Sequence, residues 1–271
     1  MDRYVVIGNP IAHSLSPQIH ARFAAQCGDR LSYERLLVPR GEFAAHARRF
    51  FAEGGAGANV TLPFKVDAFE LADASSERAR AAGAANFLAA RDGRLEADNT
   101  DGIGLVRDLE RNLALALGGK RVLVVGAGGA ARGVIAPLLE RAPARLVIAN
   151  RTLERARELA ARFRGSGAVE AVALDAIPDE PFDLVLNATS ASVQGEALSL
   201  PARAFAADAL AYDMAYGPPA DAFLAAARAR GMRVSDGLGM LVEQAAESFR
   251  LWRGKAPQTG PVIAELRNAA K

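Results

Sequence analysis

Short apolar segments alternate with longer segments of helical spacing along most of the chain. The apolar segments end at Gly, Pro or Asp-Gly, which break regular structure. Between them, apolar residues recur every three or four positions, as in helices that cover a sheet. This alternation predicts an α/β fold with a mainly parallel sheet. In the first hundred residues the predicted strands are 4–7, 31–38, 58–61, 85–90 and 94–97, and the predicted helices lie near 17–24, 42–51, 65–71 and 75–82.

The chain is long enough for two domains, and the pattern indicates where they meet. Asp92-Gly93 lies between the last two of these strands and is typical of a hairpin turn. Residues 98–102 then precede a predicted long amphipathic helix through Leu113, where we place the crossover. The predicted domains are residues 1–100 with 237–271, and residues 101–236. The second domain has predicted strands at 122–125, 145–149, 168–174, 183–186, 209–213 and 232–234, and the chain closes with helices at 237–252 and 261–270.

The segment 121–133, RVLVVGAGGAARG, changes abruptly from an apolar strand to glycines and then to a helix. This pattern is typical of a Rossmann-like turn that receives a pyrophosphate. Gly126 and Gly128 would permit the tight turn and the approach of backbone N–H groups to phosphate, and the small Ala131 would allow close helix–strand packing. The anion would lie at the helix N-terminus, which attracts negative charge. The alternative is a turn that needs glycine for its geometry alone.

The next predicted strand ends at a position that distinguishes two dinucleotides. About 20 residues beyond the glycines, an NAD site places an Asp or Glu on the ribose 2′-hydroxyl. This chain has Arg151 there, with Arg155 one turn later on the same helix face. Because an arginine suits a 2′-phosphate, we interpret this segment as an NADP site. The alternative is two solvated arginines on a surface helix.

Composition excludes several classes of protein. The 271 residues are 51% hydrophobic and 24% charged with a net charge of +2, and the basic residues are dispersed. This is ordinary for a globular protein and unlike a nucleic-acid or membrane-surface binder. The single cysteine, Cys27, agrees with a reducing compartment. No signal peptide or membrane span of about 18 apolar residues is visible. We expect a cytoplasmic monomer or homodimer with no nucleic-acid or membrane partner.

The first domain carries polar residues near predicted strand ends, where open α/β sheets bind ligands. Simpler explanations exist for several of them. Ser16 before Pro17 fits a helix N-cap, Asp101 fits a cap of the next helix, and Lys65 fits a surface lysine. The three histidines lack the spacing of metal ligands, so no metal is predicted. The candidate residues are Ser14, Ser16, Asn59, Thr61, Lys65, Asn86 and Asp101.

Seven motifs, taken together, are specific to one enzyme family. They are the glycine turn and 8–17 (GNPIAHSLSP), 58–65 (ANVTLPFK), 98–102 (DNTDG), 150–152 (NRT), 187–190 (NATS) and 236–246 (DGLGMLVEQAA). They closely resemble the shikimate dehydrogenase family over nearly the whole chain. The resemblance implies a substrate domain, a Rossmann-like NADP domain, and C-terminal helices that return to the first domain. It also implies reversible NADP-dependent reduction of 3-dehydroshikimate to shikimate in aromatic amino-acid biosynthesis.

The resemblance assigns roles to matching residues. Lys65 and Asp101 are implied to be the catalytic pair. Hydride reduction of a ketone builds negative charge on oxygen, so Lys65 beside that oxygen could stabilise the charge and supply the proton. The implied substrate contacts are Ser14, Ser16 and Tyr216 at the carboxylate, and Asn59, Thr61, Asn86 and Gln244 at or near the ring hydroxyls. The implied cofactor contacts are Gly126, Ala127, Gly128, Gly129 and Ala130 at the pyrophosphate, Asn150, Arg151, Thr152 and Arg155 at the adenosine phosphate, and Thr189, Ser190, Met214 and Gly237 at the nicotinamide.

The chain departs from the family pattern in a few places. Phe87 follows Asn86 where the family commonly has a threonine, which puts local hydroxyl contacts in question. Leu15 replaces a frequently basic residue, and the glycine often found after the 187–190 motif is missing. Two alternative functions stay open. One is a quinate/shikimate dehydrogenase of broader specificity, which usually has an acid in place of Arg151. The other is a non-catalytic dinucleotide-binding regulator, which the presence of both Lys65 and Asp101 opposes.

Overall fold

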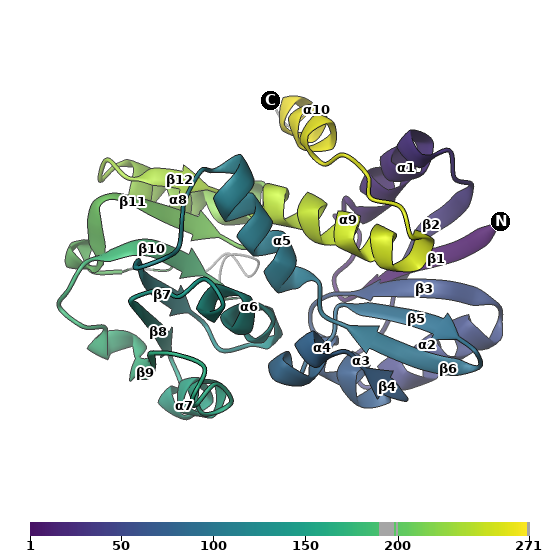
Figure 1. Ribbon diagram of the computed structural model, residues 1–271, viewed down its shortest axis with the longest axis horizontal. Coiled ribbons are helices and arrows are strands. Elements are labelled where there is room, and N and C mark those ends of the chain that lie inside the picture. The colour runs from purple at the N-terminus through teal and green to yellow at the C-terminus, as the bar shows by residue number, and fades with distance from the viewer. Residues whose placement is uncertain (190–197, 199, 270–271) are drawn as a thin grey trace. The chain divides into compact units, whose positions relative to one another are not determined.

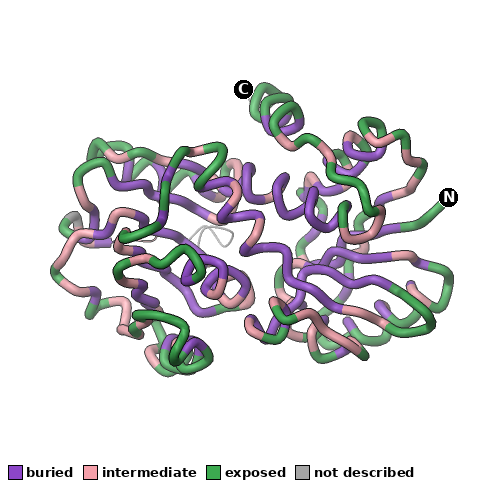
Figure 2. The backbone as a smooth tube through the Cα atoms, in the orientation of Figure 1, coloured by how far each residue is buried: buried purple, intermediate pink, exposed green. Residues whose placement is uncertain are grey.

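The computed structural model describes residues 1–189, 198 and 200–269 and divides the chain into two compact units (Figure 1). Unit 1 contains Met1–Leu105 and Leu241–Lys271, and unit 2 contains Val106–Met240. Each unit is built around a six-stranded sheet. The predicted α/β class is therefore confirmed. Figure 2 shows that the strands are mostly buried, whereas the helices and connections carry most of the exposed backbone.

The sheet of unit 1 combines a parallel part with an antiparallel hairpin. Its order is β2 (Leu31–Leu37), β1 (Asp2–Gly8), β3 (Gly55–Val60), β5 (Phe87–Arg91), β6 (Arg94–Asp98) and β4 (Ala74–Ser75). Strand β1 is parallel to β2 and β3, and β4 is parallel to β6, whereas β5 is antiparallel to both of its neighbours. The turn between β5 and β6 has positive φ at Asp92 and Gly93, 49° and 73°, as in a type I′ hairpin. The hairpin prediction is confirmed.

Strand β1 is buried on both faces, which explains its uninterrupted apolar run. Val5 and Ile7 belong to a core that α2 (Phe43–Ala52) and α3 (Lys65–Leu71) complete on one face. Tyr4 and Val6 pack on the other face against Tyr33 and against Trp252. The remaining helices of this unit are α1 (Ser16–Cys27), α4 (Glu77–Ala82), α10 (Gly260–Ala269), most of α5 (Asp101–Arg107) and most of α9 (Leu238–Arg253), which contains Trp252.

Strand β3 begins at Gly55, three residues before the strand predicted at 58–61. Glycines at these positions look like a loop in the sequence, but here they leave room for aromatic rings. A Cβ on Gly55 would lie 2.3 Å from the Phe50 ring, and one on Gly57 would lie 2.3 Å from Nε1 of Trp252. Since no larger side chain fits, the glycines belong to the strand for packing reasons.

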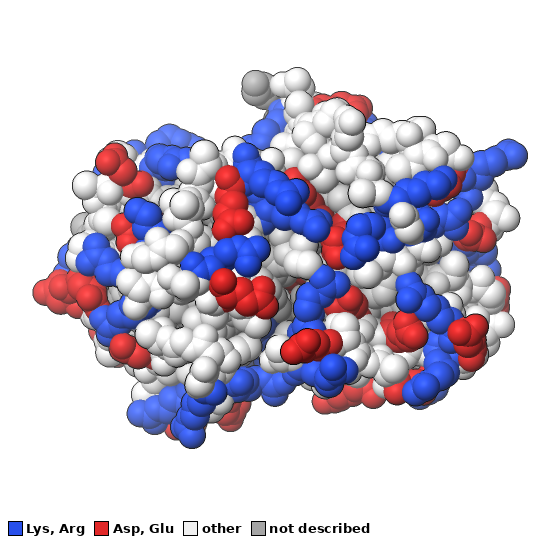
Figure 3. Space-filling model, in the orientation of Figure 1, with Lys and Arg blue, Asp and Glu red and all other residues white. Residues whose placement is uncertain are grey.

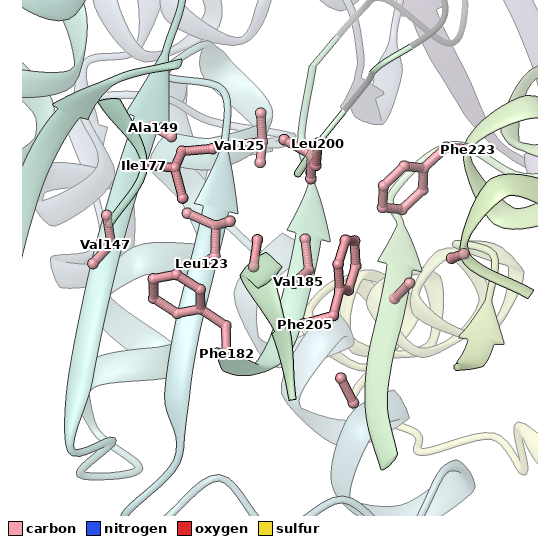
Figure 4. Packing of buried hydrophobic residues seen from close by; sticks show 14 of the residues in the cluster. Leu123, Val125, Val147, Ala149, Ile177, Phe182, Val185, Leu200, Phe205 and Phe223 are labelled. Carbon is pink, nitrogen blue, oxygen red and sulfur yellow. The ribbon is translucent and has the colours of Figure 1, made fainter. Parts of the chain in front are cut away.

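The sheet of unit 2 is entirely parallel, as expected for a Rossmann-like domain. Its order is β12 (Arg233–Ser235), β11 (Phe205–Asp213), β10 (Phe182–Asn187), β7 (Arg121–Val125), β8 (Arg145–Asn150) and β9 (Val169–Ala173). Figure 4 shows apolar side chains of neighbouring strands, among them Leu123, Val147 and Val185, packed on one face of this sheet. The helical segments are α6 (Gly129–Leu139), α7 (Leu153–Ala161), α8 (Asp221–Arg228), η2 (Leu174–Ala176), η4 (Ala202–Ala204) and η5 (Pro218–Ala220).

The long helix predicted from residue 101 through Leu113 is wrong in its second half. Helix α5 (Asp101–Arg107) passes into a π-helical turn, η1 (Asp108–Asn112). In this wider turn the buried Asp108 carboxylate accepts hydrogen bonds from the Tyr212 hydroxyl at 2.7 Å and from the Asn112 amide at 2.9 Å. A Cβ on Gly239 would come within 1.9 Å of the same carboxylate. The helical periodicity of the sequence gives no sign of this inward turn.

Candidate active site

One edge of the sheet in unit 1 collects the polar residues predicted from strand ends. Ile7 of β1 is in register with Val60 of β3, and Asn59 is in register with Phe87 of β5. Phe87 is in turn paired with Asp98 of β6. The ends of β1, β3 and β6 and the start of β5 therefore meet at the same edge. The segments that leave this edge carry Ser14, Ser16, Thr61, Lys65, Asn86 and Asp101.

Lys65 and Asp101 form an ion pair that is largely removed from solvent. The Lys65 Nζ donates to Oδ2 of Asp101 at 2.5 Å, and the two side chains are only 14% and 6% exposed. Lys65 is the first residue of α3 and Asp101 is the first residue of α5. Lys65 is thus not an ordinary surface lysine. Asp101 also lies inside α5 rather than before it as a cap, and its other carboxylate oxygen accepts from Asn86 at 2.8 Å.

Asn86 connects this ion pair to its surroundings. Its Nδ2 lies 2.9 Å from Oγ1 of Thr100 and 3.0 Å from Oε1 of Gln244, and its Oδ1 accepts from the backbone N–H of Thr100 at 2.7 Å. Gln244 comes from α9 and donates to the carbonyl of Leu241 at 2.9 Å. The structure therefore brings Asn86 and Gln244, two predicted ring-hydroxyl contacts, into direct contact beside the Lys65–Asp101 ion pair.

Asn59 has both of its amide hydrogens in use. Its Nδ2 donates to the Asn86 carbonyl at 3.1 Å and to Oγ of Ser248 at 2.9 Å. Its Oδ1 accepts from the Tyr33 hydroxyl at 2.7 Å. Since an amide has two donor hydrogens, the predicted contact of Asn59 with the substrate would rest on its oxygen alone. Burial raises the pKa of Tyr33 well above its usual value, so this hydroxyl stays a donor.

His20 lies behind Tyr33 in an aromatic cluster. The two rings are stacked, with centroids 4.2 Å apart and planes 6° apart. His20 is 1% exposed, and among the described residues neither ring nitrogen has a hydrogen-bond partner. Burial lowers the pKa of His20 to about 3, an effect that neighbouring Asn59 only partly offsets. His20 is therefore a neutral structural residue rather than an acid–base group.

Ser14 and Ser16 lie at the start of α1 with their hydroxyls directed at one another. The Ser14 Oγ lies 3.2 Å from Oγ of Ser16, and both residues are buried. The helix begins at Ser16 itself, and its cap residue Leu15 makes no side-chain capping bond. The N-cap explanation of Ser16 is therefore wrong, and it is the Ser14 hydroxyl that accepts the Ser16 N–H, at 3.3 Å.

A second group of charged residues supports the segment that carries Asp101. Arg78 donates to both carboxylate oxygens of Asp98, at 3.0 and 2.6 Å, and also contacts the buried Glu247 of α9 at 3.3 Å. Asp98 accepts the backbone N–H of Asn99 at 2.6 Å, and Asn99 accepts that of Asp101 at 3.1 Å. Sequence reasoning missed all three as supports: Arg78 and Glu247 lie outside the motifs, and the motif that contains Asp98 does not indicate its partner Arg78.

In unit 2 the glycine turn has the geometry that a pyrophosphate needs. Gly126 has a φ of 114°, and a Cβ there would lie 2.9 Å from the backbone of Ala188. Gly128 faces open space, with no atom within 4 Å of an added Cβ. It precedes α6, whose N-terminus has no side-chain cap, so the first N–H groups of this eleven-residue helix are open to an anion. Ala131 is fully buried, as close packing requires.

Two unpaired arginines follow strand β8. Asn150, the last residue of β8, donates to the carbonyl of Thr152 at 2.8 Å and shapes the turn. Arg151 and Arg155 are exposed, and among the described residues neither guanidinium has a hydrogen bond or ion pair, although the backbone N–H of Arg155 donates to the Thr152 carbonyl at 3.2 Å. The acid between them, Glu154, pairs with Arg157 at 3.0 Å. These residues fit the additional phosphate of NADP, because both cations are free to bind it.

The predicted nicotinamide contacts follow the ends of β10 and β11. Thr189 donates through its N–H and its hydroxyl to Oδ1 of Asn187, at 3.1 and 2.8 Å. A Cβ on Gly237 would lie 2.3 Å from the carbonyl oxygen of Met214, so only glycine fits there. Tyr216 is half-buried in the segment after β11. Ser190 lies outside the described residues.

The described residues contain no metal-ligand cluster, and the face drawn in Figure 3 carries no stripe of a single charge. Within the described residues, no group of three or more His, Cys, Asp or Glu side chains could hold a metal ion. Acidic and basic side chains are intermixed on the face drawn in Figure 3. In the part of the chain that the structure describes, every helix is too short or too polar to cross a membrane.

Three family models match successive parts of the chain. The shikimate dehydrogenase substrate binding domain matches residues 6–88, the shikimate/quinate 5-dehydrogenase model matches 108–195, and the shikimate 5′-dehydrogenase C-terminal domain matches 237–267. A protein of Halorhodospira halophila named shikimate dehydrogenase (NADP(+)) is 55% identical over 99% of either chain. The chain belongs to the shikimate dehydrogenase family.

The solved structures that are similar to this chain include one that contains both NADP(H) and shikimate. An Ael1 enzyme from Pseudomonas putida is 48% identical, with a TM-score of 0.90 over 98% of either chain. Shikimate 5-dehydrogenase from Thermus thermophilus, in complex with NADP(H) and shikimate, is 35% identical, with a TM-score of 0.86 over 99% of this chain and 100% of that one. The two-unit architecture is therefore that of the shikimate dehydrogenases.

Phe87, the main departure from the shikimate dehydrogenase pattern, has a structural role in this chain. It is buried, and its ring stacks on Trp252 with centroids 5.0 Å apart. Trp252 also donates to the carbonyl of Leu88 at 3.1 Å. The hydroxyl that a threonine would offer is thus replaced by an aromatic contact, while Asn86 beside it keeps its bond to Asp101.

Proposed function

We propose that this protein catalyses the reversible, NADP-dependent reduction of 3-dehydroshikimate to shikimate. The observation that carries the proposal is the buried Lys65–Asp101 ion pair, held by Asn86 at one edge of the sheet in unit 1. The membership of the chain in the shikimate dehydrogenase family supports the same reaction. The free arginines after β8 support NADP as the cofactor.

In the proposed reaction, Lys65 acts on the ketone oxygen. NADPH supplies the hydride when bound. As the carbonyl carbon receives the hydride, its oxygen gains an electron pair, and the Lys65 ammonium stabilises the developing charge and transfers a proton to it. Asp101 holds Nζ of Lys65 in place through the 2.5 Å contact. In the oxidation of shikimate, the neutral amine accepts the hydroxyl proton.

The other predicted contacts orient the ring. We assign the substrate carboxylate to Ser14, Ser16 and Tyr216, and the ring hydroxyls to Thr61, Asn86 and Gln244. Asn59 acts mainly by holding Asn86 and Ser248, since its donors are occupied. Phosphates would be held by Gly126, Ala127, Gly128, Gly129 and Ala130 and by Asn150, Arg151, Thr152 and Arg155, and the nicotinamide by Thr189, Ser190, Met214 and Gly237.

The test is the change in absorbance at 340 nm when shikimate or quinate is mixed with NADP or NAD. Fast reduction only of NADP by shikimate supports the proposal. Comparable rates with quinate or NAD would identify a dehydrogenase of broader specificity. Binding of NADP without any turnover would instead favour the non-catalytic regulator. A cytoplasmic location and a monomeric or homodimeric state stay predictions, which fractionation and sedimentation would test.

A further inference from the structure

The residues assigned to the substrate carboxylate contain no cation. Ser14, Ser16 and Tyr216 offer hydroxyls, which are neutral donors. Yet an anion taken out of water needs compensation of its charge as well as hydrogen bonds. Arg35 is the cation that the structure places against this segment. Its Nε and Nη2 both donate to the backbone carbonyl of Ser14, at 3.0 and 2.6 Å.

The register of the sheet explains how Arg35 reaches Ser14. Arg35 is in β2 opposite Val6 of β1, and β1 leads directly into the segment that holds Ser14. Residues two apart in a strand share a face, and Tyr33 on this face contacts Asn59 of the same site. Tyr33 and Arg35 of one strand therefore act on two parts of the site from the same face of the sheet.

The charge of Arg35 is available to a nearby anion. Among the described residues no carboxylate pairs with its guanidinium, whereas many other arginines of unit 1 have acidic partners, as Arg22 has Glu265. The two N–H groups also hold the Ser14 carbonyl oxygen, so its partial negative charge is offset by a full positive one. Both effects lower the electrostatic cost of placing an anion at the two serines.

We propose that Arg35 makes this enzyme selective for an anionic substrate, acting through Ser14 as a positioning residue and by its charge. The inference rests on the proposed function, because it uses shikimate as the substrate. It adds a residue outside the motifs that carry the family resemblance. Because Arg35 is exposed and solvent screens its charge, the expected change in binding is about 3- to 10-fold.

The test compares shikimate with its methyl ester, which has the same ring but no negative charge. Arg35→Gln is expected to raise KM for shikimate about 5-fold, to leave kcat within about 2-fold, and to leave kcat/KM for the ester within about 2-fold. If the ester is not oxidised, its Ki against shikimate replaces kcat/KM. Arg35→Lys should restore most of the loss, because it keeps the charge. Arg30→Gln, at an exposed position before β2, is the matched control and should change neither KM for shikimate nor kcat/KM for the ester.

The outcomes separate the inference from the function on which it rests. Equal losses for shikimate and the ester would show that Arg35 only supports the loop, and would overturn the proposal. Unchanged KM for shikimate in Arg35→Gln would overturn it as well. If the unsubstituted protein binds NADP but does not oxidise shikimate, the proposed function itself fails. Loss of selectivity in Arg35→Gln, with activity intact in the unsubstituted protein, supports both.

Discussion

Replacing His20 by phenylalanine should make unit 1 less sensitive to acid. The His20 ring is buried against Tyr33, Phe23 and Phe249, so phenylalanine keeps the aromatic contacts. Burial lowers the pKa of the native ring to about 3, whereas an unfolded histidine has a pKa of about 6.5. As the pH falls below about 6.5, the unfolded chain binds a proton that the folded chain refuses. The resulting stability is present above the unfolded pKa and is lost as the pH falls towards the folded pKa.

The size of the effect follows from linkage. At pH 5 the ring of the unfolded chain is almost fully protonated. The contribution of His20 to the free energy of unfolding is therefore about 2 kcal/mol lower at pH 5 than at pH 7.5. The figure is nearly the same for any folded-state pKa of about 4 or lower, because the folded ring is then still neutral at pH 5. His20→Phe removes this contribution. Between pH 7.5 and pH 5, the free energy of unfolding of the variant should therefore fall by about 2 kcal/mol less than that of the unsubstituted protein.

Urea unfolding followed by Trp252 fluorescence is the appropriate assay. Trp252 is the single tryptophan of the chain, and its ring lies 5.5 Å from that of His20. The signal therefore reports on unit 1 itself, even if the two units unfold separately. His46→Gln, a partly exposed histidine of α2, controls for loss of a histidine as such. If His20→Phe loses as much stability as the unsubstituted protein over this pH range, the ring is not held neutral by burial.

Three further predictions concern the catalytic pair, the cofactor and the packing of β3. Lys65→Met should lower kcat by about 10²- to 10⁴-fold while calorimetry still detects shikimate binding; near-normal turnover would rule out its proton-transfer role. Arg151→Gln should raise KM for NADP by about 10-fold or more and leave KM for NAD within about 2-fold; equal effects on the two cofactors would refute the 2′-phosphate assignment. Gly57→Ala should cost about 1–3 kcal/mol of stability, because its Cβ would collide with Trp252. The control Gly260→Ala, whose Cβ meets no atom within 4 Å, should not cost this stability. Equal melting temperatures of the two variants would contradict the packing argument.

Sequence reasoning reached the class of fold and singled out Lys65 and Asp101, which the structure brings together, because both have local signals. Apolar runs bounded by glycine and proline indicated the strands, and Asp92-Gly93 indicated the hairpin. It did not reach contacts between distant segments. Nothing near Gly57 indicates that Trp252 will lie against it, and nothing near Asp108 indicates a buried bond to Tyr212 that accompanies a π-helical turn. Such contacts depend on which helix covers which part of a sheet, and helical or strand periodicity contains no such information.

The same limit applies within the site. The motifs identified residues of the candidate site such as Lys65, Asp101 and Asn86, but some of the side chains that support the site come from residues outside the motifs. Arg78 and Arg35 are isolated arginines in a chain that has many, and only the structure shows that one clamps Asp98 and the other holds the Ser14 carbonyl. Their importance depends on geometry at about 3 Å, the range of a hydrogen bond, which a single sequence does not encode in any local pattern.

The path of the chain through unit 1 has a consequence for its synthesis on the ribosome. Residues 106–240 form unit 2 and emerge before residues 241–253 of α9, which carry Gln244, Ser248 and Trp252 into unit 1. Domains generally fold as units when all their parts are available. Unit 2 can therefore fold during translation, whereas β3 of unit 1 stays uncovered until Trp252 of α9 has been synthesised. The N-terminal unit of this protein is therefore the last to be completed, and chains that stop before α9 would expose its aromatic core to chaperones and proteases.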